Sequence, residues 1–184
     1  MAFMEQRILR WDGSGKPFEV LDVPELPIDS GWIWVDLRPL PDAPPVALDN
    51  LVRLLGLDRL AAHDALYDVD LPKVDDFGDH LLIVLHELAN QRIETSEVDC
   101  FLTKQVLVTV HDDDSPSIDV LWSALQTRAE LAQGGASDLC AMLADGVTRR
   151  LLSVIDAFDE RLEDMHGLSD HLGLYAAPRH VVPA

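Results

Sequence analysis

The sequence has little of what an extracellular, disulfide-stabilised or nucleic-acid-binding protein needs. Its 184 residues include two cysteines, Cys100 and Cys140, too few for a disulfide framework and too far apart in sequence for a zinc ribbon. Both stand among apolar residues, so we expect buried free thiols in a reducing compartment. The 14 Lys and Arg residues against 33 Asp and Glu give a net charge of −19. That charge disfavours nucleic acid and anionic membranes, because phosphate binding needs clustered basic residues.

Catalytic motifs and long apolar runs are equally scarce. No apolar segment approaches the roughly 18 residues of a membrane helix, and the N-terminus lacks the apolar core of a secretory signal. We therefore expect a soluble chain. The seven histidines form neither an HExxH motif nor a close pair with a cysteine, and no GxSxG elbow is present. The GSGK fragment at 13–16 lacks the spacing of a phosphate loop. We expect no enzyme.

The apolar pattern predicts one domain with one sizeable core, because 48% of the residues are hydrophobic. Residues 1–31 read as mostly irregular, and a tail at 166–184 loses the pattern, which leaves 1–165 as the domain. Short connections between the later strands indicate an antiparallel meander. The expected elements are strands at 18–23 and 32–37, helices at 47–55 and 58–67, strands at 73–77, 81–88, 97–103 and 106–111, and helices from 115 and from near 137.

The stretch 64–88 places several carboxylates just before an apolar run that is typical of a buried strand. Hard divalent cations prefer oxygen ligands, and magnesium keeps much of its water, so a few carboxylates suffice to hold it. The alternative is a solvated acidic rim without a ligand. The HDDDS run at 111–115 is better explained as helix capping. The carboxylates of the stretch are Asp64, Asp68, Asp70, Asp75, Asp76 and Asp79.

The order of motifs along the chain resembles the cytoplasmic N-terminal domain of the CorA family of magnesium transporters, which includes zinc-transporting relatives. The resemblance spans residues 30–165, and its most specific parts are the PKVDDF…LLIVLHEL block and the FLTKQVLVTVH hairpin. In order, the motifs are WIWVDL, a leucine-rich helix ending in LGL, RLAAHDAL, LPKVDDFGDHLLIVLHEL, EVDCFLTKQVLVTVH, and the helix from LCAMLADGV to FDERLEDM.

This resemblance implies an α/β fold in which a mixed, largely antiparallel β-sheet is packed between helices as an α/β/α sandwich and leads into a long C-terminal stalk helix. In the family the stalk runs to two membrane helices with a Gly-Met-Asn signature, which this sequence does not contain. Divalent ions bind between neighbouring subunits there. The matching ligand positions are Asp64 in HDAL and Asp145 in LADGV, although the Glu that commonly precedes the first is here His63.

The implied function is that of a cytoplasmic regulatory, cation-sensing domain of a divalent metal ion transporter, on the cytoplasmic face of the inner membrane. The domain would bind Mg²⁺ weakly, would belong to a homo-oligomer in the full-length protein and would not conduct ions alone. Two alternatives stay open. One is a zinc-transporting relative, in which His63 favours Zn²⁺ because imidazole suits the softer ion. The other is a stand-alone soluble acidic scaffold with no metal role.

Overall fold

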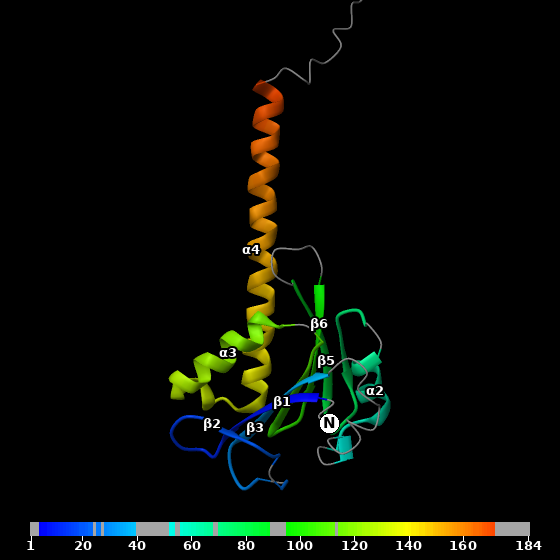
Figure 1. The fold of residues 1–184 in the computed structure, drawn as a ribbon, viewed down its shortest axis with the longest axis vertical. Helices are drawn as coiled ribbons and strands as arrows, with labels where there is room; N and C mark the ends of the chain where they lie inside the picture. The colour runs from blue at the N-terminus through cyan, green and yellow to red at the C-terminus, as the bar shows by residue number, and fades with distance from the viewer. Residues whose placement is uncertain are drawn as a thin grey trace, which may run out of the picture.

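The computed structural model of the chain shows a β-sheet with helices on both faces and one long helix that rises far beyond the body (Figure 1). The structure describes residues 4–23, 25–26, 28–39, 52–53, 56–67, 70–88, 95–112 and 114–171. The elements are β1 (Met4–Trp11), β2 (Phe18–Val20), β3 (Trp32–Pro39), α2 (Arg59–Tyr67), β4 (Lys73–Asp76), β5 (Leu81–Leu88), β6 (Thr95–Leu102), β7 (Val106–Val110), α3 (Pro116–Thr127), the 3₁₀-helix η1 (Ala129–Ala132) and α4 (Gly135–His171).

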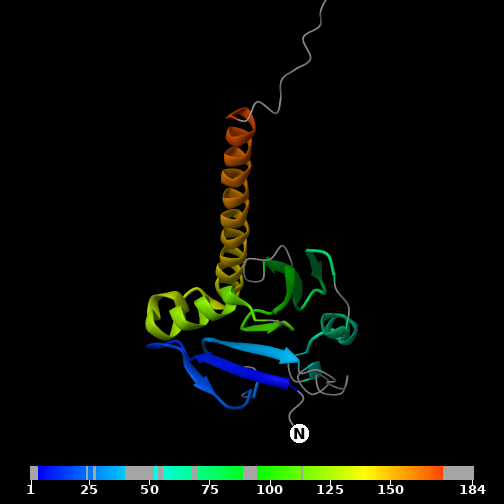
Figure 2. The same ribbon diagram turned by 45° about the horizontal axis from the view of Figure 1, so that its top comes forward.

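The seven strands form a single mixed sheet in the order β2-β1-β3-β7-β6-β5-β4. Strands β4 to β7 form the antiparallel meander that the short connections predict. All neighbours pair antiparallel except β3 and β7, which run parallel in the middle of the sheet. The chain leaves β3 toward α2 and leaves β7 toward α3, and these helices lie on opposite sides of the sheet (Figure 2).

Strand β3 lies inside the sheet, between β1 and β7, and its residues from Trp32 to Leu37 are apolar on both faces apart from Asp36. Every side chain from Trp32 to Leu37 is buried, as a strand covered on two sides requires. The indole of Trp32 donates a hydrogen bond to the carbonyl of Ala132 at 2.7 Å. Gly31, just before the strand, has a φ of +85°, and a Cβ there would lie 1.8 Å from the carbonyl oxygen of Trp11. Only glycine fits this approach of β1 to the start of β3.

Two hydrophobic cores fill the two sides of the sheet. On one side, Ala61 and Ala62 of α2 join the core that contains Val35 and Phe101. On the other side, α3 and the first half of α4 cover the face that contains Trp34. The buried residues of α4 are Ala136, Leu139, Cys140, Leu143 and Val147. Beyond this segment α4 leaves the body as a stalk (Figure 1).

The fold class agrees with the prediction of a mixed sheet between helices followed by a long C-terminal helix. Two differences exceed three residues. Residues 4–11 form an eight-residue strand inside the segment that the sequence predicts as mostly irregular. Helix α4 continues to His171, so residues 166–171 are helical and not part of a loose tail. The remainder of that tail and most of the helix expected at 47–55 fall outside the described residues.

Candidate functional site

Helix α2 carries the first candidate ligand, Asp64, and its N-terminus is firmly held. The carboxylate of Asp58 accepts hydrogen bonds from the backbone N–H groups of Leu60 and Ala61, each at 2.9 Å. This capping satisfies donors that have no partner inside the helix. The backbone N–H of Asp58 in turn lies 3.2 Å from Nε2 of His80, the residue that precedes β5. The start of α2 is therefore attached to the sheet.

The chain just after α2 is attached to the same strands. Nε2 of His86 in β5 lies 2.7 Å from the carbonyl oxygen of Asp70. The carboxylate of Glu97 in β6 accepts from the backbone N–H of Asp70 at 2.8 Å. Strands β5 and β6 thus hold the helix that carries Asp64. The side chain of Asp64 itself lies outside the described set.

Asp145, the second candidate ligand, lies on the body half of α4 between the buried residues Leu143 and Val147, but its own side chain is exposed. Its Oδ2 accepts from Nε of Arg149, one turn further along, at 2.7 Å. This hydrogen bond and the charge of Asp145 raise the pKa of Arg149 above its ordinary value. A metal ion at Asp145 has to displace or share that guanidinium.

The structure does not bring Asp64 and Asp145 together within one chain. Helices α2 and α4 cover opposite faces of the sheet, as both ribbon views show (Figures 1 and 2). Among the side chains that the structure describes, no group of three or more His, Cys, Asp or Glu residues is arranged to hold a metal ion. A shared ion therefore needs carboxylates from two copies of the chain.

Most other carboxylates of the acidic stretch have local partners. Nζ of Lys73 lies 2.7 Å from Oδ2 of Asp70 and 3.2 Å from Oδ2 of Asp75, and these hydrogen bonds raise the pKa of Lys73 to about 12. Asp76 accepts from the backbone of Gly78 at 2.8 Å and shapes the turn after β4. These contacts agree with the alternative interpretation of this stretch as a solvated acidic rim. Asp68 lies outside the described residues.

One buried acid in this region, Asp99, is mostly protonated, unlike the charged carboxylates around Lys73. Asp99 on β6 is 3% exposed. Burial raises its pKa to about 8, and the nearby carboxylate of Glu97 acts in the same direction. Asp99 is therefore mostly a neutral acid at pH 7. A neutral carboxyl group is a poor ligand for Mg²⁺, which prefers charged oxygen donors.

A second buried acid, Asp36 on β3, sits in a network that the sequence does not reveal. Nε of Arg7 donates to its Oδ2 at 2.7 Å, the hydroxyl of Thr109 donates to Oδ1, and Nε2 of His111 lies 3.2 Å from Oδ1. Burial alone would raise the pKa of Asp36, but the close His111 ring, the hydrogen bond from Thr109 and the charge of Arg7 outweigh it and lower the pKa.

This network borders a cavity of about 290 Å³ at the carboxyl ends of β3 and β7. Ligands of open α/β sheets often bind at such a point, where neighbouring parallel strands lead to opposite faces. Here the charges in the wall pair with each other, since Arg38 contacts Asp114 at 2.8 Å and Arg7 contacts Asp119 at 2.7 Å. The lining residues are Glu5, Gln6, Arg7, Asp36, Arg38, His111, Asp114, Ser115 and Asp119.

The two cysteines meet across the second core. Cys100 on β6 and Cys140 on α4 are both free and buried, as the sequence suggests. The neighbouring thiol of Cys140, together with burial, raises the pKa of the Cys100 thiol. Nothing in the sequence pattern predicts that these two cysteines lie next to each other. The pair adds to the attachment of α4 to the sheet.

Comparison with known proteins places this geometry in a family. The family described as CorA-like Mg²⁺ transporter protein matches residues 29–170. The chain is 23% identical over 155 residues to YfjQ of Bacillus subtilis (strain 168), whose name describes it as a metal ion transporter; the match covers 84% of this chain and 46% of that protein. The chain thus spans about half the length of this curated relative.

Solved structures share the fold at low sequence identity. The soluble domain of CorA from Methanocaldococcus jannaschii superposes with a TM-score of 0.68 at 21% identity, covering 88% of this chain and 64% of that one. The cytoplasmic domain of ZntB from Vibrio parahaemolyticus RIMD 2210633 gives 0.68 at 14% identity, covering 89% and 65%. Among the helices the structure describes, none combines the length and apolar character needed to cross a bilayer. On the strength of the family match over most of its length, the chain belongs to the CorA-like Mg²⁺ transporter family.

Proposed function

We propose that this chain is the regulatory, cation-sensing domain of a divalent metal ion transporter, and that Mg²⁺ binds weakly between Asp64 of one copy and Asp145 of another. The observation that carries the proposal is the placement of these two residues on helices that cover opposite faces of one sheet (Figure 2). In an oligomer, the α2 face of one copy can meet the α4 face of the next. The domain acts on the cytoplasmic face of the membrane and does not conduct ions by itself.

Electrostatics supports a role for the cation. Each copy has a net charge of −19, so copies that assemble side by side repel one another. A divalent ion at the contact offsets part of that repulsion and favours the assembled state. Because Asp145 already pairs with Arg149 at 2.7 Å, we expect weak binding that responds to millimolar changes in free Mg²⁺.

The stalk offers a second surface for assembly. Five apolar side chains on α4 beyond the body are each between 41% and 63% exposed. Their spacing alternates between four and three residues, which is the heptad pattern of a helix that packs against another helix. Another copy of α4 satisfies this pattern, which supports a homo-oligomer. The residues are Leu151, Ile155, Phe158, Leu162 and Met165.

One residue, His63, favours the alternative in which the domain binds Zn²⁺. His63 is exposed on α2 beside Asp64, and imidazole binds Zn²⁺ in preference to Mg²⁺. The ZntB domain shares the fold, which leaves the choice of ion to experiment. A higher affinity for Zn²⁺ that is lost in His63→Ala, with Mg²⁺ binding unchanged, would favour the zinc reading.

A titration tests the proposal. The chain is titrated with MgCl₂ at constant ionic strength, adjusted with NaCl so that general screening stays fixed. We expect thermal stability and oligomer size, measured by sedimentation velocity, to rise with Mg²⁺. Asp64→Asn and Asp145→Asn should each abolish the rise. The matched control is Asp159→Asn, which removes the same charge from an exposed position on the stalk.

Two outcomes would sink the proposal. One is the absence of any change up to tens of millimolar Mg²⁺, a range that covers weak exposed oxygen sites. The other is a loss of response in Asp159→Asn as large as in Asp145→Asn. That second result would mean that the ion acts on the total charge and not at a site.

A further inference from the structure

Glu87 is the most deeply buried charged side chain next to the stalk. It is the seventh residue of β5 and is 0% exposed. Side chains alternate between the two faces of a strand, and Glu87 continues the row of Ile83 and Leu85, which pack against the core under α3 and α4. An isolated carboxylate in such a place is very unfavourable unless it is paired and hydrogen-bonded. Its partners therefore show what it does.

Three donors come from the first turn of α3. Ser115, the N-cap residue, donates its hydroxyl to Oε2 at 2.5 Å. The backbone N–H of Ser117 donates to Oε1 at 3.0 Å, and the Ser117 hydroxyl donates to the same oxygen. The positive end of a helix dipole lies at its N-terminus, so this is a favourable place for a carboxylate. Glu87 thus attaches the start of α3 to the end of β5.

The fourth partner belongs to α4. Nε of Arg150 lies 2.9 Å from Oε1 of Glu87. The N–H is not aligned for a hydrogen bond, so the attraction is mainly electrostatic. Arg150 follows Val147 by less than one turn, and among the residues of α4 whose burial the structure describes Val147 is the last buried one. The ion pair therefore lies where the stalk leaves the body.

Beyond this pair nothing in the described part of the chain supports the stalk from the side. From residue 151 to residue 166 every side chain is exposed except that of Val154, which is half-buried. Helices α3 and α4 also approach closely at the same level, because a methyl group on Gly146 would lie 3.5 Å from Cβ of Ser117. Strand β5, helix α3 and helix α4 thus meet at one carboxylate.

We propose that Glu87 is a positioning residue, and that its contacts to Ser115, Ser117 and Arg150 set the direction in which the stalk leaves the body. A buried ion pair is a weak source of stability, but it does fix geometry, because leaving either charge unpaired is unfavourable. The inference concerns the stalk angle and does not depend on metal binding. If the proposed function holds as well, this joint is where a movement of the body is passed to the stalk.

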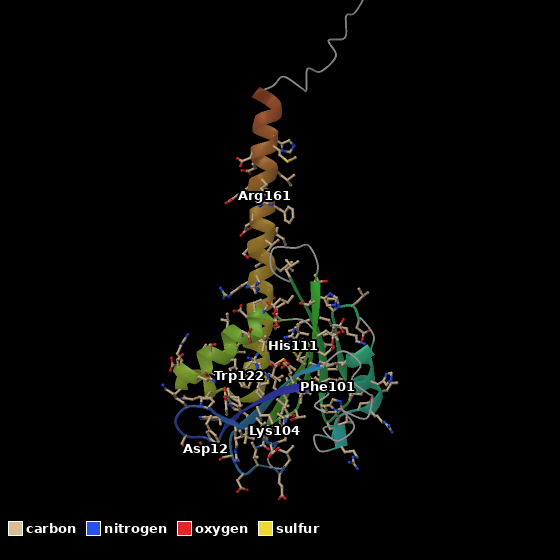
Figure 3. All side chains as sticks on the ribbon, in the orientation of Figure 1. Asp12, Phe101, Lys104, His111, Trp122 and Arg161 are labelled. Carbon is tan, nitrogen blue, oxygen red and sulfur yellow. The ribbon has the colours of Figure 1, made fainter. Side chains whose placement is uncertain are left out.

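Distances between spin labels test this inference in the full chain without added metal. One nitroxide pair joins Val74, exposed on the edge strand β4, to Arg161 on the stalk, and a second joins Val74 to Lys104 in the body; Figure 3 shows Lys104 and Arg161 far apart along the molecule. About 20 Å of helix separate Val147 from Arg161, so a tilt of about 10° moves the label by about 4 Å. Labelled chain is diluted with unlabelled chain, so that only distances within one copy contribute.

We expect a narrow Val74–Arg161 distribution in the native chain and a broadening of several ångströms in Glu87→Gln and in Arg150→Gln, with the Val74–Lys104 distance unchanged. Arg150→Lys keeps the charge and should restore part of the narrow distribution. The matched control is Asp36→Asn, which removes an equally buried carboxylate (4% exposed) whose hydrogen bonds and ion pairs go to Arg7, Thr109 and His111 and not to α4. It should lower stability and leave the stalk distance narrow.

The inference is overturned if the Val74–Arg161 distribution stays narrow in Arg150→Gln while the near-ultraviolet circular dichroism of the body is native. It is also overturned if Asp36→Asn broadens the stalk distance as much as Arg150→Gln does. Should Glu87→Gln fail to fold, Arg150→Gln alone decides, since Arg150 is partly exposed and its loss leaves Glu87 with three hydrogen bonds.

Discussion

The two halves of α4 carry the same apolar spacing and have opposite surroundings. In the first half, Leu139, Leu143 and Val147 are buried against the sheet. In the second half, Ile155 and Leu162 continue the pattern, yet they are 45% and 49% exposed. An amphipathic pattern therefore specifies which face of a helix seeks cover, but not what covers it. In the first half the cover is the chain's own sheet, and for the second half we propose another copy.

The largest expected effect contrasts one leucine from each half. Leu143→Ala should lower the free energy of unfolding by about 3 kcal/mol, because it leaves a cavity in a packed core. Leu162→Ala should change it by less than about 1 kcal/mol at concentrations where the chain is monomeric, since half of that side chain already contacts water. Urea unfolding, with midpoints and slopes compared, checks both values. Equal losses would mean that the stalk is also covered within one chain.

The sequence predicts much of the sheet and of the body helices because local patterns decide them. The bulky, mostly apolar WIWVDL predicts a strand, and Ser115 followed by proline predicts the start of α3, whose N-cap is Ser115. Strand β1 escapes prediction because Ile8 and Leu9 are buried in different cores while charged residues flank them. The pattern there is neither alternating nor uniformly apolar.

The functional residues also divide into those that the sequence predicts and those that only the fold reveals. Asp64 and Asp145 follow from the resemblance to the family, and their pairing between copies stays a prediction. Glu87 and Asp36 cannot be found from local patterns, because in sequence a buried carboxylate looks like a surface one. The two serine partners of Glu87 are 28 and 30 residues away, and Thr109, a partner of Asp36, is 73 residues away. Only the fold brings these groups together.

The next prediction tests whether another copy of the chain covers the exposed apolar face in the second half of α4. Leu162→Glu places a charge in the apolar stripe and should raise the dissociation constant for self-association at least about tenfold, which corresponds to about 1.4 kcal/mol. Sedimentation equilibrium measures the constant. The control is Ser153→Glu, which adds the same charge on the outer side of the heptad pattern and should have little effect. A native chain that stays monomeric at all concentrations would contradict the proposed self-association of the stalk.

A smaller effect tests the packing of the first half against α3. Gly146→Ala should stabilise the chain by about 0.5–1 kcal/mol, because alanine favours the helix and restricts the unfolded chain. The new methyl group would lie 3.5 Å from Cβ of Ser117, an ordinary contact. The contrasting variant is Gly135→Ala, where φ is +85° and an alanine is strained. Thermal unfolding of both variants checks the sign, and a loss of stability in Gly146→Ala would show that α3 and α4 leave no room.

The smallest expected effect concerns Asp145. This residue lies in the half of α4 that packs against the sheet, but its side chain is exposed to solvent. Its ion pair with Arg149 joins side chains that are 59% and 76% exposed. Such a pair, four residues apart on a helix, contributes little to stability, because water and salt screen it. Without metal, Asp145→Asn should therefore unfold within about 0.5 kcal/mol of the native chain, as Asp159→Asn should. If that near-neutrality holds, a loss of the Mg²⁺ response in Asp145→Asn alone reports a lost ligand and not a weakened fold. A loss of 2 kcal/mol or more without metal would remove this interpretation and assign Asp145 a structural role.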